Sequence, residues 1–256
     1  MGIHPTAIVA PGAELEATVE VGPYAVIGPH VRLGAACQIL AHSVIDGWTV
    51  IEPGCTIGPA AALGGPPQDR KYQGEPTQLV IGSGSVIREY VTVHRSTSAA
   101  EPTRIGAGAY LMASCHVGHN CQLGDEVTIT SFAGLSGHVV VEPEVIISGF
   151  VGVHQFVRIG RLALVSGQSG VTKDVPPFVI VEGRPAVVRG LNTVGLLRRG
   201  LGEDRRRVLK QAFRLLFRSK QNVRDALAAV RASCEPTAEV CHLVDFIAAS
   251  ERGICR

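Results

Sequence analysis

Five of the nine histidines gather in the middle of the chain, between residues 94 and 154. A histidine with its ordinary pKa of about 6.5 can take up a proton at neutral pH, and its ring nitrogens also ligate metals. A group of them therefore indicates either general-base catalysis or a metal centre. The five are His94, His116, His119, His138 and His154.

Three of these histidines share a register. Apolar residues recur every six positions through 105–171, and three hexapeptides make a coil of 18 residues. His119 then stacks beneath Gly137, next to His138. The position one coil beyond His138 is two residues past His154. We expect His119, His138 and His154 to lie along one edge, with His116 nearby.

Two chemistries fit such an edge. One is zinc ligation, as in the carbonic anhydrases built from the same repeat. The other is acyl transfer, in which a histidine takes a proton from a sugar hydroxyl that attacks a thioester. The oxyanion then needs a backbone N–H, and Gly137 is a natural donor because glycine permits close approach. The seven cysteines form no C-x-x-C pair, so a structural zinc site is disfavoured.

A strict six-residue period dominates the sequence. From Ile3 to Val171, 26 of 29 positions in steps of six are Ile, Leu or Val. A helix does not repeat every six residues, so we predict a mainly β, three-sided parallel solenoid whose coils bury each other. The fourth residue after each anchor is usually small or β-branched, which suits its interior. Glycine often follows the anchor, and we expect it to supply unusual turn angles.

Two polar segments, 64–79 and 95–104, interrupt the period and are predicted to be loops ejected from the solenoid. The repeat ends at Asp174, where two prolines follow. We assign residues 1–189 to the solenoid domain.

Residues 190–256 are expected to form a C-terminal α-helical domain. Helices are predicted over 203–220, near 222–233 and after Pro236. The segment holds 13 Lys and Arg against 7 Asp and Glu, whereas the remainder holds 11 against 15. This basic module is expected to attract an acidic partner or phosphate ligand. The chain shows no secretory leader and no run of 18 apolar residues, so we expect a soluble cytoplasmic protein without a membrane span.

Several motifs closely resemble the UDP-N-acetylglucosamine O-acyltransferases of lipid A synthesis, over nearly the whole chain. The most specific are the loop PQDRKYQGEPT and the stretch LMASCHVGHNCQLGD; IREYVTVHRST, GLSGHVVV, GVHQFVRIG, SGVTKDVPPFVIVEG and GLNTVGLLRRG are further matches. The resemblance implies a left-handed parallel β-helix (hexapeptide-repeat solenoid) and a homotrimer with sites between solenoids. It also implies transfer of a 3-hydroxyacyl chain from acyl carrier protein to the 3-hydroxyl of UDP-N-acetylglucosamine, with no cofactor, metal or nucleic acid.

The resemblance also implies residue roles. His119 matches the general base and Gly137 the oxyanion donor, while Gly167 matches the position that limits acyl length and leaves the groove open. The remaining matched residues are substrate-binding. They are Gln68, Asp69, Lys71, His94, His116, His138, His154, Gln155, Asn192, Arg198 and Arg199.

Three residues depart from the family pattern. Asn120 follows the presumed base where well-known members have Asp, Val194 stands where an acid is common, and Pro185 stands where His is common. An Asn orients an imidazole but does not stabilise its cation by charge, so a 3-amino sugar is a second possible acceptor. A UDP-3-O-acylglucosamine N-acyltransferase, a zinc carbonic anhydrase and a non-catalytic scaffold are also compatible with the repeat.

Overall fold

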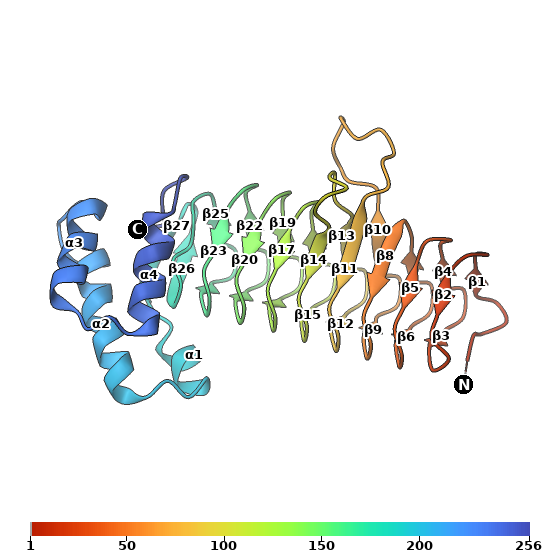
Figure 1. Ribbon diagram of the computed structural model, residues 1–256, viewed down its shortest axis with the longest axis horizontal. Coiled ribbons are helices and arrows are strands. Elements are labelled where there is room, and N and C mark those ends of the chain that lie inside the picture. Colours follow the sequence, from red (N-terminus) through yellow and green to blue (C-terminus); the bar gives the residue numbers. More distant parts are fainter. Residues whose placement is uncertain (1) are drawn as a thin grey trace.

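The computed structural model describes residues 2–256 as a long three-sided β-solenoid with a group of helices at its C-terminal end (Figure 1). Successive strands belong to three different parallel sheets, so that each coil contributes one strand to each. The first sheet contains nine strands, the second eight and the third ten, two of which form the terminal hairpin.

The strands are short, and most have only two residues. In stacking order, the first sheet comprises β1 (Ile8–Val9), β4 (Val26–Ile27), β7 (Val44–Ile45), β10 (Ala62–Gly65), β13 (Thr92–His94), β16 (His116–Val117), β19 (Gly134–Leu135), β22 (Gly152–Val153) and β25 (Gly170–Val171). The second comprises β2 (Glu14–Leu15), β5 (Arg32–Leu33), β8 (Trp48–Ile51), β11 (Gln78–Ile81), β14 (Thr103–Ile105), β17 (Gln122–Leu123), β20 (Val140–Val141) and β23 (Arg158–Ile159). The third comprises β3 (Glu20–Val21), β6 (Gln38–Ile39), β9 (Thr56–Ile57), β12 (Val86–Ile87), β15 (Tyr110–Leu111), β18 (Thr128–Ile129), β21 (Ile146–Ile147), β24 (Leu164–Val165), β26 (Val179–Gly183) and β27 (Ala186–Leu191).

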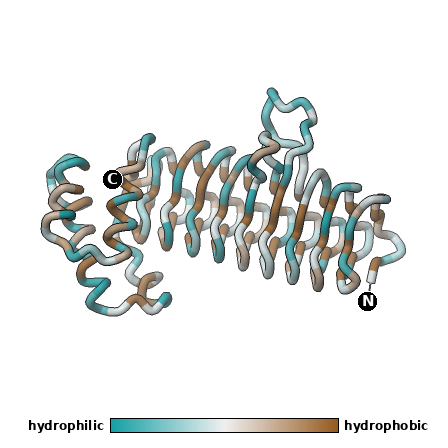
Figure 2. Tube along the Cα trace, viewed as in Figure 1, coloured by the Kyte–Doolittle hydropathy of each residue, from teal (hydrophilic) through white to brown (hydrophobic). Residues whose placement is uncertain are grey.

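The pairing follows the predicted 18-residue register. His116 pairs with Gly134, Gly134 with Gly152, and Gly152 with Gly170. The anchor residues point inward and are buried almost throughout, as are the small residues between them, such as Cys37. One continuous core therefore runs the length of the solenoid. Figure 2 shows the resulting alternation of apolar and polar positions along each coil.

The expected role of the glycine after each anchor was wrong. The positive φ angles lie two residues further on, mostly at non-glycine residues such as Asn120 (φ 61°) and His138 (φ 61°). Gly118 is required for space instead, because a Cβ there would lie 2.9 Å from the backbone N of Gly137 on the next coil. These glycines allow successive coils to pack in contact at their corners.

Both predicted loops are shorter than their assigned ranges. Strands β10 and β11 leave only residues 66–77 as the first loop, which projects from the solenoid (Figure 1). In the second, Arg95 and Ser96 are buried, and β14 already begins at Thr103. Because Arg95 and Ser96 are polar, we expected them to be exposed. Both side chains are instead buried and hydrogen-bond to neighbouring segments.

The solenoid is finished by an antiparallel hairpin that the sequence did not lead us to expect. Strand β26 extends the third sheet and pairs with β27, which ends at Leu191. Four helices follow: α1 (Thr193–Arg198), α2 (Glu203–Phe217), α3 (Val223–Ser233) and α4 (Ala238–Ala248). The short α1 was not predicted, and α2 ends three residues before the expected Lys220. No helix within residues 2–256 is long and apolar enough to cross a membrane.

Two polar contacts fasten the helices to the last coils. The buried Asp174 carboxylate accepts hydrogen bonds from Arg158 N (2.9 Å) and Ser250 Oγ (2.8 Å), which ties the C-terminal segment to the solenoid. On α4, His242 Nε2 lies 2.6 Å from Glu142 Oε2 of the solenoid. The hydrogen bond to Glu142 raises the pKa of His242, so the pair holds a proton more tightly than a free histidine.

We predict that the His242–Glu142 pair makes stability depend on pH. Because the folded-state pKa of His242 is raised, its contribution is complete below the unfolded pKa of about 6.5 and is lost as pH rises through the folded value. The His242 side chain is 39% exposed, so the effect should be about 1 kcal/mol or less. Denaturant unfolding of His242→Gln should show a larger loss of stability at pH 6 than at pH 9. His4→Gln, at the opposite end, is the control; an equal loss for His242→Gln at both pH values would contradict the prediction.

Candidate active site

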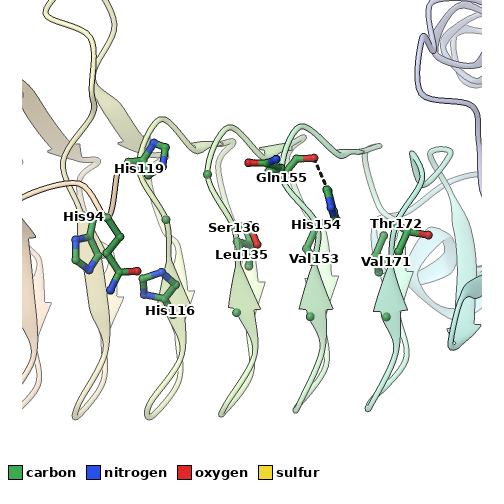
Figure 3. Close-up of a pocket in the computed structure, with 16 residues that line it drawn as sticks. His94, His116, His119, Leu135, Ser136, Val153, His154, Gln155, Val171 and Thr172 are labelled. Atoms are coloured by element: carbon green, nitrogen blue, oxygen red, sulfur yellow. Dashed lines mark hydrogen bonds between the residues drawn. The ribbon is translucent and has the colours of Figure 1, made fainter. Parts of the chain in front are cut away.

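A groove of about 640 Å³ runs along the outer face of the first sheet and its adjoining corner. It extends from His94 and His119 to Thr172 and is drawn in Figure 3. Of the residues predicted from the sequence, it brings together Gln68, His94, His116, His119, Gly137, His154 and Gln155. Two of the three histidines of the predicted register, His119 and His154, therefore line one concave surface.

The tautomer of His119 is set by its neighbour. Its Nδ1 lies 2.8 Å from Asn120 Oδ1. The backbone N–H of Thr97 donates to the same oxygen (3.1 Å), and because this group can only donate, it identifies that atom of the amide as the acceptor. Nδ1 of the neutral imidazole must then carry the hydrogen. The lone pair of Nε2 is left free to accept a proton.

Gly137 lies against the His119 ring. A Cβ at position 137 would lie 2.6 Å from His119 Cε1 and 2.7 Å from Nε2, so any other residue would displace the imidazole. Within residues 2–256, the N–H of Gly137 has no backbone acceptor outside the regular ladders. The groove thus holds a proton acceptor and a backbone donor side by side.

His116 and His94 form the lower part of the histidine group (Figure 3). Their ring centroids are 5.3 Å apart in an edge-on arrangement, and His116 Nδ1 lies 2.8 Å from Thr92 Oγ1. Burial, together with neighbouring His94 and His119, lowers the pKa of His116. It is therefore neutral at neutral pH and available for hydrogen bonding to a ligand.

His138 does not line the groove, contrary to expectation. Its ring stacks on Phe156 with centroids 4.7 Å apart and meets the edge of His119 at 5.3 Å. Burial and His119 lower its pKa, so it packs against His119 as a neutral ring. His154 does line the groove, and Arg252 Nη2 lies 2.7 Å from its Nδ1. No sequence pattern indicates this arginine, because its partner is 98 residues away.

The floor of the groove is a column of glycines that the sequence prediction also missed. Gly134, Gly152 and Gly170 stack on β19, β22 and β25. A Cβ at Gly134 or Gly152 would meet no atom within 4 Å, so these positions leave open space above the sheet. Their 18-residue spacing was present in the unbroken repeat. The channel they make is suited to an extended, unbranched group.

The other expected ligand residues lie outside this groove. On the first loop, Asp69 Oδ1 accepts from Lys71 N at 2.9 Å, which shapes the turn beyond Gln68. Gly167 lies at the corner between the third and first sheets, where a Cβ would lie 3.4 Å from Gly149 O. A side chain at this position has room to project.

Asn192 and Arg199 were expected to contact the nucleotide, but their side chains make their polar contacts within the chain. Asn192 is buried: its Oδ1 caps α1 through Gly195 N (3.0 Å), and its Nδ2 donates to Leu162 O (2.9 Å). Arg199 pairs with Glu126 (2.6 Å) and Glu144 (3.4 Å) at the corner between the second and third sheets. Arg198 is exposed on the last turn of α1. Asn192 is therefore better explained as a helix cap than as a ligand.

Residues 2–256 contain no group of three or more His, Cys, Asp or Glu side chains arranged to hold a metal ion. His116 instead lies within hydrogen-bonding distance of Thr92, and His119 of Asn120. The rings of His94 and His116 pack edge-on.

The coiled fold and its histidine groove define a hexapeptide-repeat transferase. Residues 102–137 match the model described as bacterial transferase hexapeptide (six repeats). Residues 174–255 match UDP N-acetylglucosamine O-acyltransferase, domain 2.

Full-length relatives narrow the class. The chain is 45% identical over 255 residues to the acyl-[acyl-carrier-protein]--UDP-N-acetylglucosamine O-acyltransferase of Thermodesulfovibrio yellowstonii, covering 99% of both chains. It is 47% identical over 257 residues to the protein of the same name from an Anaeromyxobacter species, covering 100% of both. The solved structure of UDP-N-acetylglucosamine O-acyltransferase from Moraxella catarrhalis matches with a TM-score of 0.95 at 37% identity, covering 100% of both chains. The chain belongs to the UDP-N-acetylglucosamine O-acyltransferase family, and its solenoid is the predicted left-handed β-helix.

Proposed function

We propose that this protein transfers a 3-hydroxyacyl chain from acyl carrier protein to the 3-hydroxyl of UDP-N-acetylglucosamine, the first step of lipid A synthesis. The observation that carries the proposal is the free Nε2 of His119 beside the backbone N–H of Gly137, in a chain of this family. The direct test supplies purified protein with both substrates and identifies the product by mass spectrometry.

In this mechanism, His119 Nε2 removes the proton from the sugar 3-hydroxyl as its oxygen attacks the thioester carbonyl. A C–O bond forms, and the N–H of Gly137 stabilises the resulting oxyanion. Collapse breaks the C–S bond, and the departing thiolate of the carrier recovers the proton from His119. The products are an ester and a free carrier thiol, and cleavage of the thioester supplies the driving force. The proposed steps use only side chains and backbone groups of the protein.

Asn120 favours one second candidate, transfer to a 3-amino sugar. A neutral amide orients His119 without adding a negative charge that would stabilise the imidazolium. A neutral amine is a better nucleophile than a hydroxyl and needs less help from a base. The same mass-spectrometric assay, run with both acceptors in parallel, decides between them.

The glycine floor and Gly167 suggest where the acyl chain lies. The glycine column, which is open at Gly134 and Gly152, leads away from His119 towards the C-terminal coils, in the direction of Thr172. An extended acyl–pantetheine group fits a channel of this shape. We place the end of the acyl group near Gly167, either of the same protein chain or of a neighbouring one.

The proposed partner is an acidic acyl carrier protein. The helical module carries the excess of Lys and Arg noted in the sequence. Part of this charge is neutralised within the chain, because Arg205 pairs with Glu239 and Arg207 with Asp204 at 2.9 Å. Docking would therefore use exposed cations on the same module that lie outside these two pairs.

We predict that His119→Ala lowers turnover by about two to four orders of magnitude, the range expected for loss of a general base. The fold should survive because the ring lies on the surface of the solenoid corner. His42→Ala is the matched control. His42 lies at another corner with φ 61°, and Ala60, at the same position one coil further on, shows with φ 55° that alanine adopts this backbone conformation. Steady-state kinetics within a few-fold of wild type for His119→Ala would assign the base to another residue, His116 first.

We also predict a trimer in solution. Phe132 and Phe150 stack at 5.0 Å along one corner and are 57% and 60% exposed, so an apolar edge next to the groove is left for a neighbouring solenoid. Analytical ultracentrifugation should give the mass of three 26.9 kDa chains. A stable monomer at micromolar concentration would rule out a site completed by a second chain.

Gly167→Met is predicted to shift the products towards shorter acyl chains. The new side chain would fill the space at the proposed end of the acyl chain, and each excluded methylene is worth about 0.8 kcal/mol, or roughly four-fold in rate. Product mass spectrometry with a series of carrier thioesters measures the shift. Gly190→Met, where a Cβ meets no atom within 4 Å, is the control. An unchanged length profile in Gly167→Met would place the chain end elsewhere.

A further inference from the structure

Arg95 is a buried cation whose side-chain hydrogen bonds all go to neutral groups. It is 8% exposed; Nη1 donates to Gly64 O at 2.7 Å, and Nη2 and Nε donate to the hydroxyl of Tyr72 at 3.0 and 3.2 Å. Its guanidinium also lies over the rings of Trp48 (5.8 Å) and Tyr72 (5.5 Å). A buried charge is costly unless such contacts hold it, so the contacts define one position for Tyr72.

Tyr72 belongs to the loop 66–77, which brings Gln68 to the groove. Its hydroxyl hydrogen-bonds to Glu75 O (2.5 Å), and its backbone N–H donates to Asp69 O (3.1 Å), so the phenol is tied to the rest of the loop. The loop is also fixed at its start, where His94 Nδ1 donates to Pro66 O. Contacts from His94 and Arg95 thus hold both the start and the middle of the loop.

The next two residues hold the partner of the base. Ser96 is completely buried, and its Oγ accepts from Asn120 Nδ2 at 2.7 Å. Thr97 donates to Asn120 Oδ1 through both its N–H and its hydroxyl (2.9 Å). Each end of the Asn120 amide is therefore matched to one neighbour, and the oxygen is kept towards His119.

We propose that residues 95–97 are positioning residues that fix, from one short segment, both the loop over the groove and the tautomer of His119. Arg95 holds the loop through Tyr72, while Ser96 and Thr97 hold the amide of Asn120 in the orientation that leaves Nε2 as the proton acceptor. The kinetic part of this proposal rests on the proposed function. The two actions use different atoms, so separate substitutions should separate them.

Tyr72→Phe tests the first action. It keeps the ring but removes the hydroxyl that accepts two hydrogen bonds from Arg95. We expect the KM for the nucleotide sugar to rise about ten-fold with kcat within two-fold, since a hydrogen bond to a charged group is lost. Trypsin should also cleave faster after the exposed Arg70 and Lys71 in the same loop. Tyr110→Phe, which removes the hydroxyl bonded to Arg88 Nη1 at 3.2 Å, is the matched control.

Ser96→Ala tests the second action. It removes the acceptor of Asn120 Nδ2 and allows the amide to rotate away from His119. We expect kcat to fall about five-fold with the KM for the nucleotide sugar unchanged. The ¹⁵N spectrum of the His119 imidazole should show the Nδ1–H tautomer in the wild type and a larger share of Nε2–H in the variant. Ser98→Ala is the control, because Ser98 Oγ accepts only from Ala100 N in the same loop (3.2 Å).

Opposite outcomes overturn the proposal. If Tyr72→Phe keeps the wild-type KM and the wild-type rate of trypsin cleavage, Arg95 does not hold the loop through Tyr72. Ser96→Ala with the kinetics and imidazole spectrum of Ser98→Ala would remove Ser96 from the positioning of the base. If the wild type transfers no acyl group to the nucleotide sugar, the proposed function fails. The rate of trypsin cleavage and the ¹⁵N spectrum of His119 still test whether residues 95–97 position the loop and the imidazole.

Discussion

Parallel backbone pairing between successive coils is the constraint on which this structure depends; its register is 18 residues except where the two loops and the terminal hairpin change the length of a coil. Strands of two residues have little stability alone, and each gains it only by pairing with the coils below and above. The register requires small residues at the corners, as shown by Gly118, which lies too close to the next coil to carry a side chain. Side chains at corresponding positions therefore form columns, and this geometry places His119 against Gly137 of the next coil.

The arrangement of the corner at His119 follows from this stacking. Asn120 has φ 61°, an arrangement that Asn tolerates better than most residues, and it turns the amide back towards His119. His138 and Phe156 occupy the equivalent positions of the next two coils and stack as rings. The His119 imidazole is thus packed against the ring of His138 and hydrogen-bonded to the amide of Asn120.

The fold and the proximity of His119 to Gly137 were predictable because both depend on periodicity. A six-residue period specifies the solenoid, and counting by 18 brings His119 beside Gly137. The same counting would have found the glycine floor. What the sequence could not supply were contacts without a period: the His154–Arg252 pair, the burial of Arg95 and Ser96, and the terminal hairpin β26–β27. His138 was misplaced because counting gives its column but not the direction of its side chain.

The two ends of the solenoid are finished differently. At the C-terminal end, Ala186 and Val188 of the hairpin and Phe213 of α2 close the core. At the N-terminal end, β1 and β2 are edge strands with unpaired ladder groups, whereas β3 is covered only by a bridge between Ile3 and Val21. Ile3 and Ile8 are 54% and 64% exposed there. An uncovered strand edge can recruit another chain. Open-ended fibre growth, however, needs a matching edge at both ends, so the hairpin and helices at one end are sufficient to stop these solenoids from polymerising head to tail.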